Sequence, residues 1–137
     1  MKQTLTRSLL GVTADGGDPT AVVVRFNEHI NARDLAALGD LMTDDHTFVD
    51  TAGGSLTGKA ACLAAWRGFF EGFPDYRNVF TTLTAHGDVV AIAGRSECAE
   101  PTLAGPALWT ATIRDGRVAQ WRVHEDTPEA RRRLLGD

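Results

Sequence analysis

The chain predicts a single α+β domain, in which a strongly curved sheet of mostly antiparallel strands wraps over helices. Two observations predict this class. Apolar residues at helical spacing lie in the first half of the chain, and the second half contains long alternating segments separated by turn signals. Helices that are separated along the chain from a meander of strands indicate an α+β fold. The 137 residues, with 43% hydrophobic content, are enough for one packed domain.

An aspartate followed by a proline marks the start of the first expected helix, over about residues 19–31. Asp18 supplies an N-cap acceptor, and Pro19 fits the first helical turn. Apolar residues such as Val22 and Phe26 then recur at helical spacing. The pattern therefore predicts an amphipathic helix with one buried face.

Two further helices are expected before the long strands. Asp34 can cap a short second helix, whose apolar face includes Leu38. Trp66 and Phe70 belong to the apolar face of a third helix that ends near Gly72. We expect these aromatic side chains to contribute to the core or to an apolar wall.

Strands account for most of the remaining chain. A short strand is expected over residues 46–50, and the four long strands are expected within residues 76–87, 88–100, 107–116 and 117–126. Asp115-Gly116 is a hairpin signal, and Gly94 marks a bulge or bend inside its strand. Thr127 and Pro128 predict the start of a short terminal helix.

The composition argues against several classes of partner. A formal net charge of −4 is unfavourable for nucleic-acid binding, which needs concentrated Lys and Arg. No apolar segment approaches the roughly 20 residues that span a bilayer. Residues 1–17 lack the apolar core of a signal peptide and are expected to form a flexible leader before one domain over residues 18–137. We therefore expect a cytoplasmic protein.

A bound metal is not expected. The two cysteines, Cys62 and Cys98, lie in apolar patterns typical of buried thiols, and the four histidines are widely scattered. A bent sheet over helices leaves a concavity, which is the default place for a small ligand. The sequence thus favours a hydrophobic small molecule as the partner.

Asp50 has two interpretations. If the strand continues through it, its side chain points to the same face as Phe48, and it becomes an acid/base group in a cavity. Alternatively, its carboxylate accepts hydrogen bonds from the backbone of the turn at residues 51–54. Both interpretations stay open at this point.

Several short motifs occur in a characteristic order. They are the aspartate–x–x–glycine turn at residues 50–53, the glycine at Gly58, Phe-Pro-Asp-Tyr at residues 73–76, and a Trp-Arg…Asp-Thr ending at residues 121–127. Together they resemble the SnoaL-like proteins of the nuclear transport factor 2-like superfamily, over most of residues 19–135. The resemblance implies a cone-shaped α+β barrel of the cystatin-like type, usually a dimer formed through the sheet. It also implies cofactor-free chemistry, as in polyketide cyclases, ketosteroid isomerases and limonene-epoxide hydrolases.

Ketosteroid isomerase activity is not expected. The resemblance matches Asp50 to the general base of that enzyme, but its oxyanion hole needs a tyrosine and a protonated aspartate. Phe26 and Trp109 occupy those two positions here. A phenylalanine has no donor, and an indole N–H is a poor geometric substitute, so the developing charge would lack its stabilisation.

The residues that the resemblance implies for an epoxide hydrolase and for a polyketide cyclase are present here in part. Arg95 and Glu97 resemble the arginine–x–aspartate step of the epoxide hydrolase, although a structural or interface ion pair is the favoured interpretation of these two residues. The partner carboxylate of the hydrolase falls at Val123, so half of that site is missing. The cyclases carry one acidic residue near the end of the last strand, where this chain has Asp126 and Glu125.

The candidate catalytic residues are therefore Asp50, Arg95, Glu97 and Asp126. The residues expected to line the pocket are Phe26, His46, Phe48, Trp66, Phe70, Tyr76, Trp109, Trp121 and Glu125. We expect a cofactor-free cyclase, isomerase or hydrolase that acts on a hydrophobic, carbonyl-bearing ligand. The alternative is a non-catalytic ligand-binding or dimerisation module. A homodimer would use the outer face of the sheet, with Thr110, Arg122 and His124.

Overall fold

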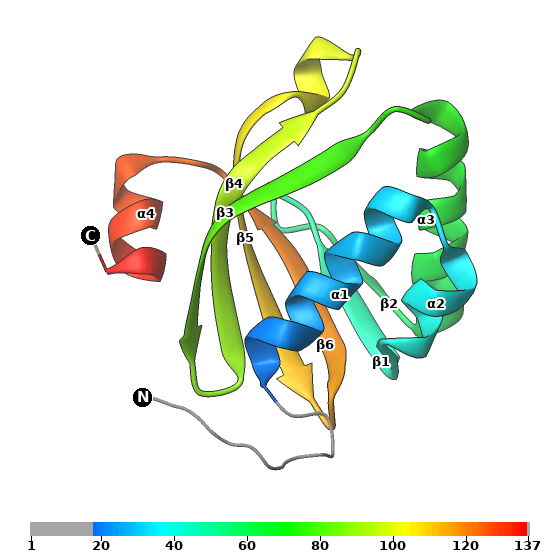
Figure 1. The fold of residues 1–137 in the computed structure, drawn as a ribbon, viewed down its shortest axis with the longest axis horizontal. Coiled ribbons are helices and arrows are strands. Elements are labelled where there is room, and N and C mark those ends of the chain that lie inside the picture. The colour runs from blue at the N-terminus through cyan, green and yellow to red at the C-terminus, as the bar shows by residue number, and fades with distance from the viewer. Residues whose placement is uncertain (1–17, 137) are drawn as a thin grey trace.

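The computed structural model describes residues 18–136, so the flexible leader expected over residues 1–17 lies outside the described residues. The helices are α1 (Pro19–Ala32), α2 (Leu35–Asp40), α3 (Lys59–Gly72) and α4 (Pro128–Leu135), with a short 3₁₀ turn, η2 (Pro101–Leu103). The strands are β1 (Met42–Val49), β2 (Ser55–Thr57), β3 (Arg77–His86), β4 (Val89–Glu97), β5 (Gly105–Arg114) and β6 (Arg117–His124). The predicted α+β class is confirmed (Figure 1).

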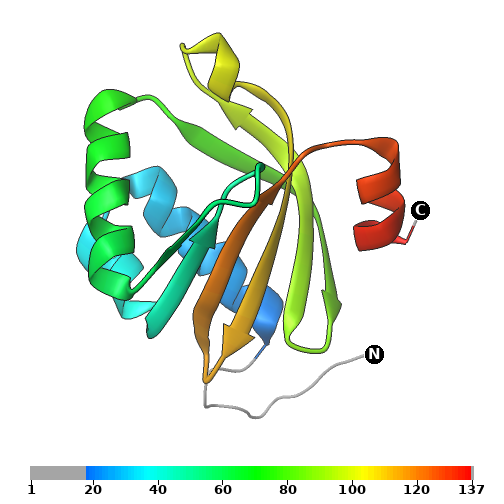
Figure 2. The ribbon, with the colours of Figure 1, turned by 180° about the vertical axis from the view of Figure 1, so that it is seen from behind.

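One curved sheet with the strand order β2-β1-β6-β5-β4-β3 organises the domain. All neighbouring pairs are antiparallel except β1 and β6, which run parallel. Helices α1, α2 and α3 lie on one side of the sheet, whereas α4 lies apart from them beyond β3 and β4 (Figures 1 and 2). The sheet therefore curves around α1 and leaves α3 facing its inner surface.

The local helix signals are confirmed. Asp18 accepts a hydrogen bond from the Thr20 amide over 3.0 Å, and Asp34 accepts one from the Ala37 amide over 3.1 Å. Thr127 caps α4 in the same way. Each cap satisfies a backbone N–H that the helix itself leaves without a partner, which fixes the start of the helix.

The boundaries of β1 correct the predicted strand over residues 46–50. The strand begins at Met42 and ends at Val49, so Asp50 belongs to the following turn. The earlier start depends on pairing with β6, in which Met42 lies opposite Val118 and Phe48 lies opposite Trp121. Because this partner lies far away in sequence, the local pattern contained no sign of it.

Gly94 lies where β3 and β4 change register, between the pairs at Phe80 and Thr82. A Cβ atom on Gly94 would lie 2.1 Å from the backbone oxygen of Val79, which no side chain tolerates. The predicted irregularity is therefore present, with the extra residue on β3. The close approach of the two backbones permits the sheet to bend sharply at this point.

The main core lies between α1 and the inner face of the sheet. Phe26 on α1 is fully buried, with its ring centroid 5.1 Å from that of Trp121. Trp109 and Trp121 lie side by side on β5 and β6, with centroids 6.3 Å apart. These large side chains anchor the curved sheet to α1 and form a rigid aromatic surface.

A second, smaller cluster packs α4 on the outer face of the sheet. Ala130 of α4 is buried with Ala93 and Leu108, and Leu134 and Leu135 cover them. Part of the outer face is thus occupied by the chain's own terminal helix. Dimerisation through this face stays a prediction.

Candidate functional site

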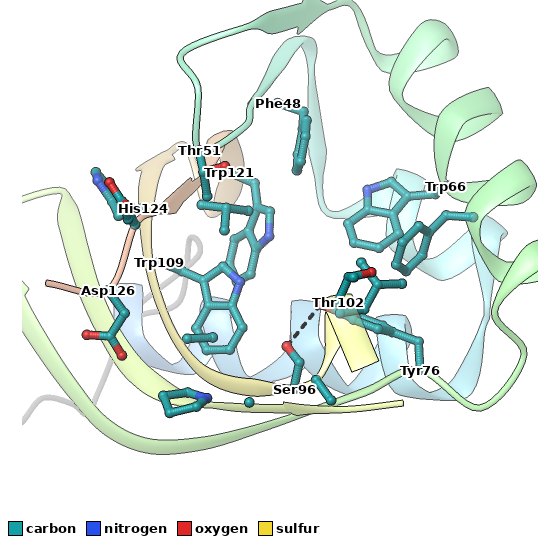
Figure 3. A pocket seen from close by; sticks show the side chains of 18 of the residues that line it. Phe48, Thr51, Trp66, Tyr76, Ser96, Thr102, Trp109, Trp121, His124 and Asp126 are labelled. Atoms are coloured by element: carbon teal, nitrogen blue, oxygen red, sulfur yellow. Dashed lines mark hydrogen bonds between the residues drawn. The ribbon is translucent and has the colours of Figure 1, made fainter. Parts of the chain in front are cut away.

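A cavity of about 500 Å³ lies between α3 and the inner face of the sheet. It is lined by Phe48, Thr51, Cys62, Ala65, Trp66, Phe69, Tyr76, Ser96, Thr102, Leu103, Ala104, Gly105, Pro106, Ala107, Trp109, Trp121, Val123, His124, Glu125 and Asp126. Figure 3 shows how the labelled side chains surround it. Its volume is within the range of small-molecule sites, and most of its surface is apolar.

Aromatic side chains form two facing walls of the cavity. Trp66 on α3 contacts Phe48 and Phe69, with ring centroids 6.5 and 5.9 Å away. Trp109 and Trp121 form the opposite wall on the sheet (Figure 3). A flat apolar molecule between these walls would exchange water contacts for ring contacts, which is favourable.

Three residues expected in the pocket lie in the core instead. Phe26 is fully buried against Trp121, and Phe70 is buried against Trp66 at a centroid distance of 5.4 Å. His46 is also fully buried, and its Nδ1 lies 2.6 Å from the Val118 carbonyl oxygen. None of the three lines the cavity, and Phe26 and Phe70 pack against the wall residues Trp121 and Trp66.

Asp50 does not line the cavity, which corrects its expected place there. Its side chain is exposed, and Oδ1 accepts hydrogen bonds from the amides of Ala52 and Gly54 over 2.9 and 2.8 Å. The backbone of Asp50 is also bonded to Gly53 and Gly54. The alternation of β1 stops at Val49, so the argument from Phe48 to Asp50 fails, and the geometry is that of a turn-forming carboxylate.

Arg95 and Glu97 are likewise not among the residues that line the cavity. Their side chains are 53% and 46% exposed and form an ion pair at 2.9 Å. They share a face of β4 as predicted, but it is the outer face. Ser96, between them, points inward and lines the cavity, a role that the sequence interpretation missed. The inward alternation of Ile92, Gly94 and Ser96 was the signal that could have found it.

Asp126 lines the cavity just beyond the end of β6, as does Glu125. Arg131 of α4 binds both carboxylate oxygens of Asp126, with Nε 2.6 Å from Oδ1 and a terminal nitrogen 2.9 Å from Oδ2. The Asp126 side chain is only 18% exposed. The hydrogen bonds from Arg131 hold the pKa of this carboxyl below its usual value, so it is ionised at neutral pH.

Hydroxyl groups gather at another part of the cavity. The Tyr76 hydroxyl lies 3.2 Å from Ser96 Oγ, which donates a hydrogen bond to Asn78 Oδ1 over 2.8 Å. Burial is the main cause that raises the pKa of Tyr76, so the phenol is protonated at neutral pH. This group can therefore supply a neutral hydrogen-bond donor inside an apolar cavity.

Two further titratable groups that line the cavity, Cys62 and His124, are electrically neutral. Burial raises the pKa of the Cys62 thiol, which disfavours the thiolate that a nucleophile would need. The pKa of His124 is lowered by burial first and then by the positive charges of Arg122 and Arg133. Its Nε2 lies 2.8 Å from the Thr110 hydroxyl. Both groups are in the form that carries no charge at neutral pH.

Within residues 18–136, no three His, Cys, Asp or Glu side chains gather in a way that could hold a metal ion. Over the same residues, no helix has the length and apolar character needed to cross a membrane. The polar groups that line the cavity include the hydroxyls of Tyr76 and Ser96 and the carboxylate of Asp126, which are suited to hydrogen bonding and proton transfer on an organic ligand.

A curved, open six-stranded sheet wrapped around helices, with an apolar cavity between the sheet and the helices, is the arrangement of the nuclear transport factor 2-like and cystatin-like folds. The chain belongs to the SnoaL-like family, because the model of the SnoaL-like domain matches residues 23–121. No curated protein is detectably similar to it in sequence.

Solved structures confirm the fold. A candidate polyketide cyclase from Sinorhizobium meliloti is 21% identical, with a TM-score of 0.69 over 76% of this chain and 94% of that chain. IdmH, a candidate polyketide cyclase from Streptomyces antibioticus, is 18% identical, with a TM-score of 0.67 over 88% and 99% of the two chains. An NTF2-like protein of unknown function from Cytophaga hutchinsonii is 15% identical, with a TM-score of 0.66 over 88% and 96%.

Proposed function

We propose that the protein is a cofactor-free enzyme that binds a flat, hydrophobic, carbonyl-bearing molecule in the cavity and moves a proton on it with Asp126. The observation that carries this proposal is an ionised carboxylate, partly withdrawn from solvent, at the wall of an aromatic cavity. The position of Asp126 after the last strand corresponds to the acidic residue that the resemblance to polyketide cyclases implies.

The lowered pKa of Asp126 limits the substrates that it could deprotonate. A carboxylate whose pKa lies below its usual value is a weak base, and a weak base deprotonates carbon slowly unless that carbon is already acidic. A carbon flanked by two carbonyl groups meets this condition. Asp126 would remove its proton, the resulting enolate would attack a second carbonyl of the same molecule, and the carboxylic acid would return the proton to the new alkoxide.

A naphthyl β-keto ester provides a direct test. In mildly acidic deuterium oxide, NMR follows the replacement of its acidic C–H protons by deuterium, with and without enzyme. The proposal predicts catalysed exchange that Asp126→Asn slows by about 100- to 10,000-fold, the usual contribution of a positioned base. Asp50→Asn is the matched control, since it removes an acid that lies outside the cavity lining, and Glu125→Gln tests the neighbouring carboxylate.

A second function, non-catalytic binding of the same kind of ligand, is favoured by a different observation. Both oxygens of Asp126 are engaged by Arg131, and Asp50 is engaged by its turn, so neither carboxylate is free to act without rearrangement. Under this alternative, the wild-type protein binds the keto ester without accelerating exchange. That result, with binding measured by quenching of tryptophan fluorescence, would replace the enzyme proposal.

A further inference from the structure

Tyr76, Ser96 and Asn78 form a hydrogen-bonded group at one part of the cavity, and the proposed proton transfer does not use them. Tyr76 and Ser96 line the cavity, and their hydroxyl oxygens lie 3.2 Å apart (Figure 3). Asn78 lies behind Ser96 and accepts its hydrogen bond. Ser96 is 7% exposed and Asn78 is 2% exposed. Burying polar groups beside an apolar cavity costs free energy unless they are paired. A buried polar network at this place is therefore a candidate for ligand recognition.

The base of this network is fixed to α1. Asn31 donates from Nδ2 to the Asn78 carbonyl over 2.9 Å and accepts from the Asn78 amide over 2.9 Å. Asn27 donates to the same carbonyl over 3.2 Å. With its backbone held from α1, Asn78 presents its side-chain oxygen to Ser96 in a set direction.

The positions of the protons determine what the network offers to a ligand. Ser96 has one hydroxyl hydrogen, and it is donated to Asn78. Tyr76 must then be the donor in its contact with Ser96. At 3.2 Å this contact is longer than a usual O–H···O hydrogen bond, so little is lost when Tyr76 donates elsewhere.

The ring of Tyr76 is held independently of its hydroxyl group. It packs edge-on against Phe69, with centroids 4.7 Å apart and an interplanar angle of 85°. Its backbone amide donates to the Phe73 carbonyl over 3.1 Å, and its carbonyl accepts from the Arg33 guanidinium. The hydroxyl hydrogen can therefore turn from Ser96 to a ligand while the ring stays in place.

We propose that Tyr76 is the hydrogen-bond donor for a second oxygen of the ligand, remote from the carbon on which Asp126 acts. This inference rests on the proposed function. Figure 3 shows Asp126 on one side of Trp109 and Tyr76 on the other, so the two groups would meet different parts of one ligand. The ligand class is thus an extended aromatic molecule with an acceptor oxygen, such as a ketone or quinone, at the end away from Asp126. Ser96 and Asn78 are positioning residues.

The remote position has a kinetic consequence. A hydrogen bond that is equally strong in the bound substrate and in the transition state lowers KM and leaves kcat unchanged. In the exchange assay, on a keto ester with an added ketone at its far end, Tyr76→Phe should raise KM by about 2- to 12-fold, which is the usual range for one neutral hydrogen bond. A fall in kcat at unchanged KM would instead assign Tyr76 to the reacting carbonyl and overturn the remote role.

A binding measurement separates this inference from the enzymatic proposal. The probe is a naphthalene dye with one ketone and one dimethylamino group, whose emission moves to longer wavelength when its carbonyl accepts a hydrogen bond. Tyr76→Phe should move the emission of the bound dye to shorter wavelength and weaken its binding by about 2- to 12-fold. Dimethylaminonaphthalene without the ketone, as the matched ligand, should bind both proteins equally.

Ser96→Ala should not weaken binding of the dye, in contrast to Tyr76→Phe. The variant removes the acceptor that competes for the Tyr76 hydrogen, so the dye should bind as tightly as to wild type or more tightly. The melting temperature should fall, because Asn78 loses its partner. A weaker affinity in Ser96→Ala, or an unchanged emission in Tyr76→Phe, would overturn the inference. If the dye does not bind to wild type, the cavity proposal itself fails.

Discussion

Arg131 on α4 holds both carboxylate oxygens of Asp126 in a paired arrangement, with the two nitrogen–oxygen distances at 2.6 and 2.9 Å. Asp126 follows the last strand, and α4 packs on the outer face of the sheet through Ala130. The terminal helix thus controls the charge of a carboxylate on the inner side of the sheet. This relationship leads to the first prediction.

Replacing Arg131 with Gln should raise the pKa of Asp126, because the hydrogen bonds from the guanidinium are the main cause of its lowering. The acid limb of the pH–rate profile for proton exchange should then move to higher pH. Above that limb, the released carboxylate is a stronger base and exchange should be faster. Arg132→Gln, an exposed neighbour on the same helix, is the control and should leave the profile unchanged.

The ion pair between Asp126 and Arg131 should stabilise the folded protein at neutral pH and lose this effect on acidification. A carboxyl whose pKa is lowered by folding stabilises the protein above its ordinary pKa, and this contribution disappears as the pH falls through the folded-state value. Wild type should therefore lose more stability on acidification than Arg131→Gln, in denaturant unfolding followed by circular dichroism. Equal losses in both proteins would show that the ion pair does not form in solution.

Asp50 is predicted to act on folding alone. Asp50→Asn keeps an oxygen that can accept from Ala52 and Gly54, so it should retain both stability and proton exchange. Asp50→Ala removes the acceptor and should lower the free energy of unfolding by about 1 kcal/mol. Loss of exchange activity in a folded Asp50→Asn protein would return this residue to the catalytic role.

Because of His46 and His124, the protein should become less stable at mildly acidic pH. Burial lowers the pKa of His46 and of His124, so protonation favours the unfolded chain. Their contribution is complete above the ordinary histidine pKa of about 6.5 and is lost as the pH falls below it. His46→Asn places an amide near the Val118 carbonyl without a titrating group. Above the pH range in which the carboxyl groups titrate, the pH slope of the unfolding free energy should be reduced in this variant and reduced further when His124→Asn is added.

A pair of glycine variants tests the bend of the sheet. Gly94→Ala should lower the free energy of unfolding by about 3 kcal/mol or more, because the new methyl group would clash with the Val79 carbonyl. Gly68 on α3 has open space around the same position, and Gly68→Ala should stabilise the protein by about 0.5–1 kcal/mol. Similar stability of the two variants in urea unfolding would contradict the close backbone contact.

Local signals predicted most of the helices and strands, but they did not reveal the features that depend on strand pairing. The caps at Asp18, Asp34 and Thr127 were predictable because a cap involves only the next few residues. The start of β1 at Met42 and the short strand β2 were missed, since both depend on pairing with other strands. The overall class could be predicted because the order of elements limits the possible layers.

Only part of the candidate site could be predicted, because the sequence pattern does not show which face of each strand is inward. Alternation correctly grouped Arg95 with Glu97, but it cannot say which face of a strand is inward. Ser96 was missed for this reason, whereas Trp109 and Trp121 were expected to line the pocket and are among the residues around the cavity. The role of Asp50 depended on whether the strand ends one residue earlier, and strand ends are the least certain feature of a sequence pattern.

The central claim is that an aromatic ligand occupies the cavity between Trp66 on α3 and Trp121 on β6. The most direct measurement is the set of nuclear Overhauser effects between the protons of the bound naphthyl β-keto ester and the protein. The account predicts contacts to the indole protons of Trp66 and Trp121. Contacts to the methyl groups of Val24 and Leu83, in the shallow groove beside α1, without contacts to the two indoles, would contradict it.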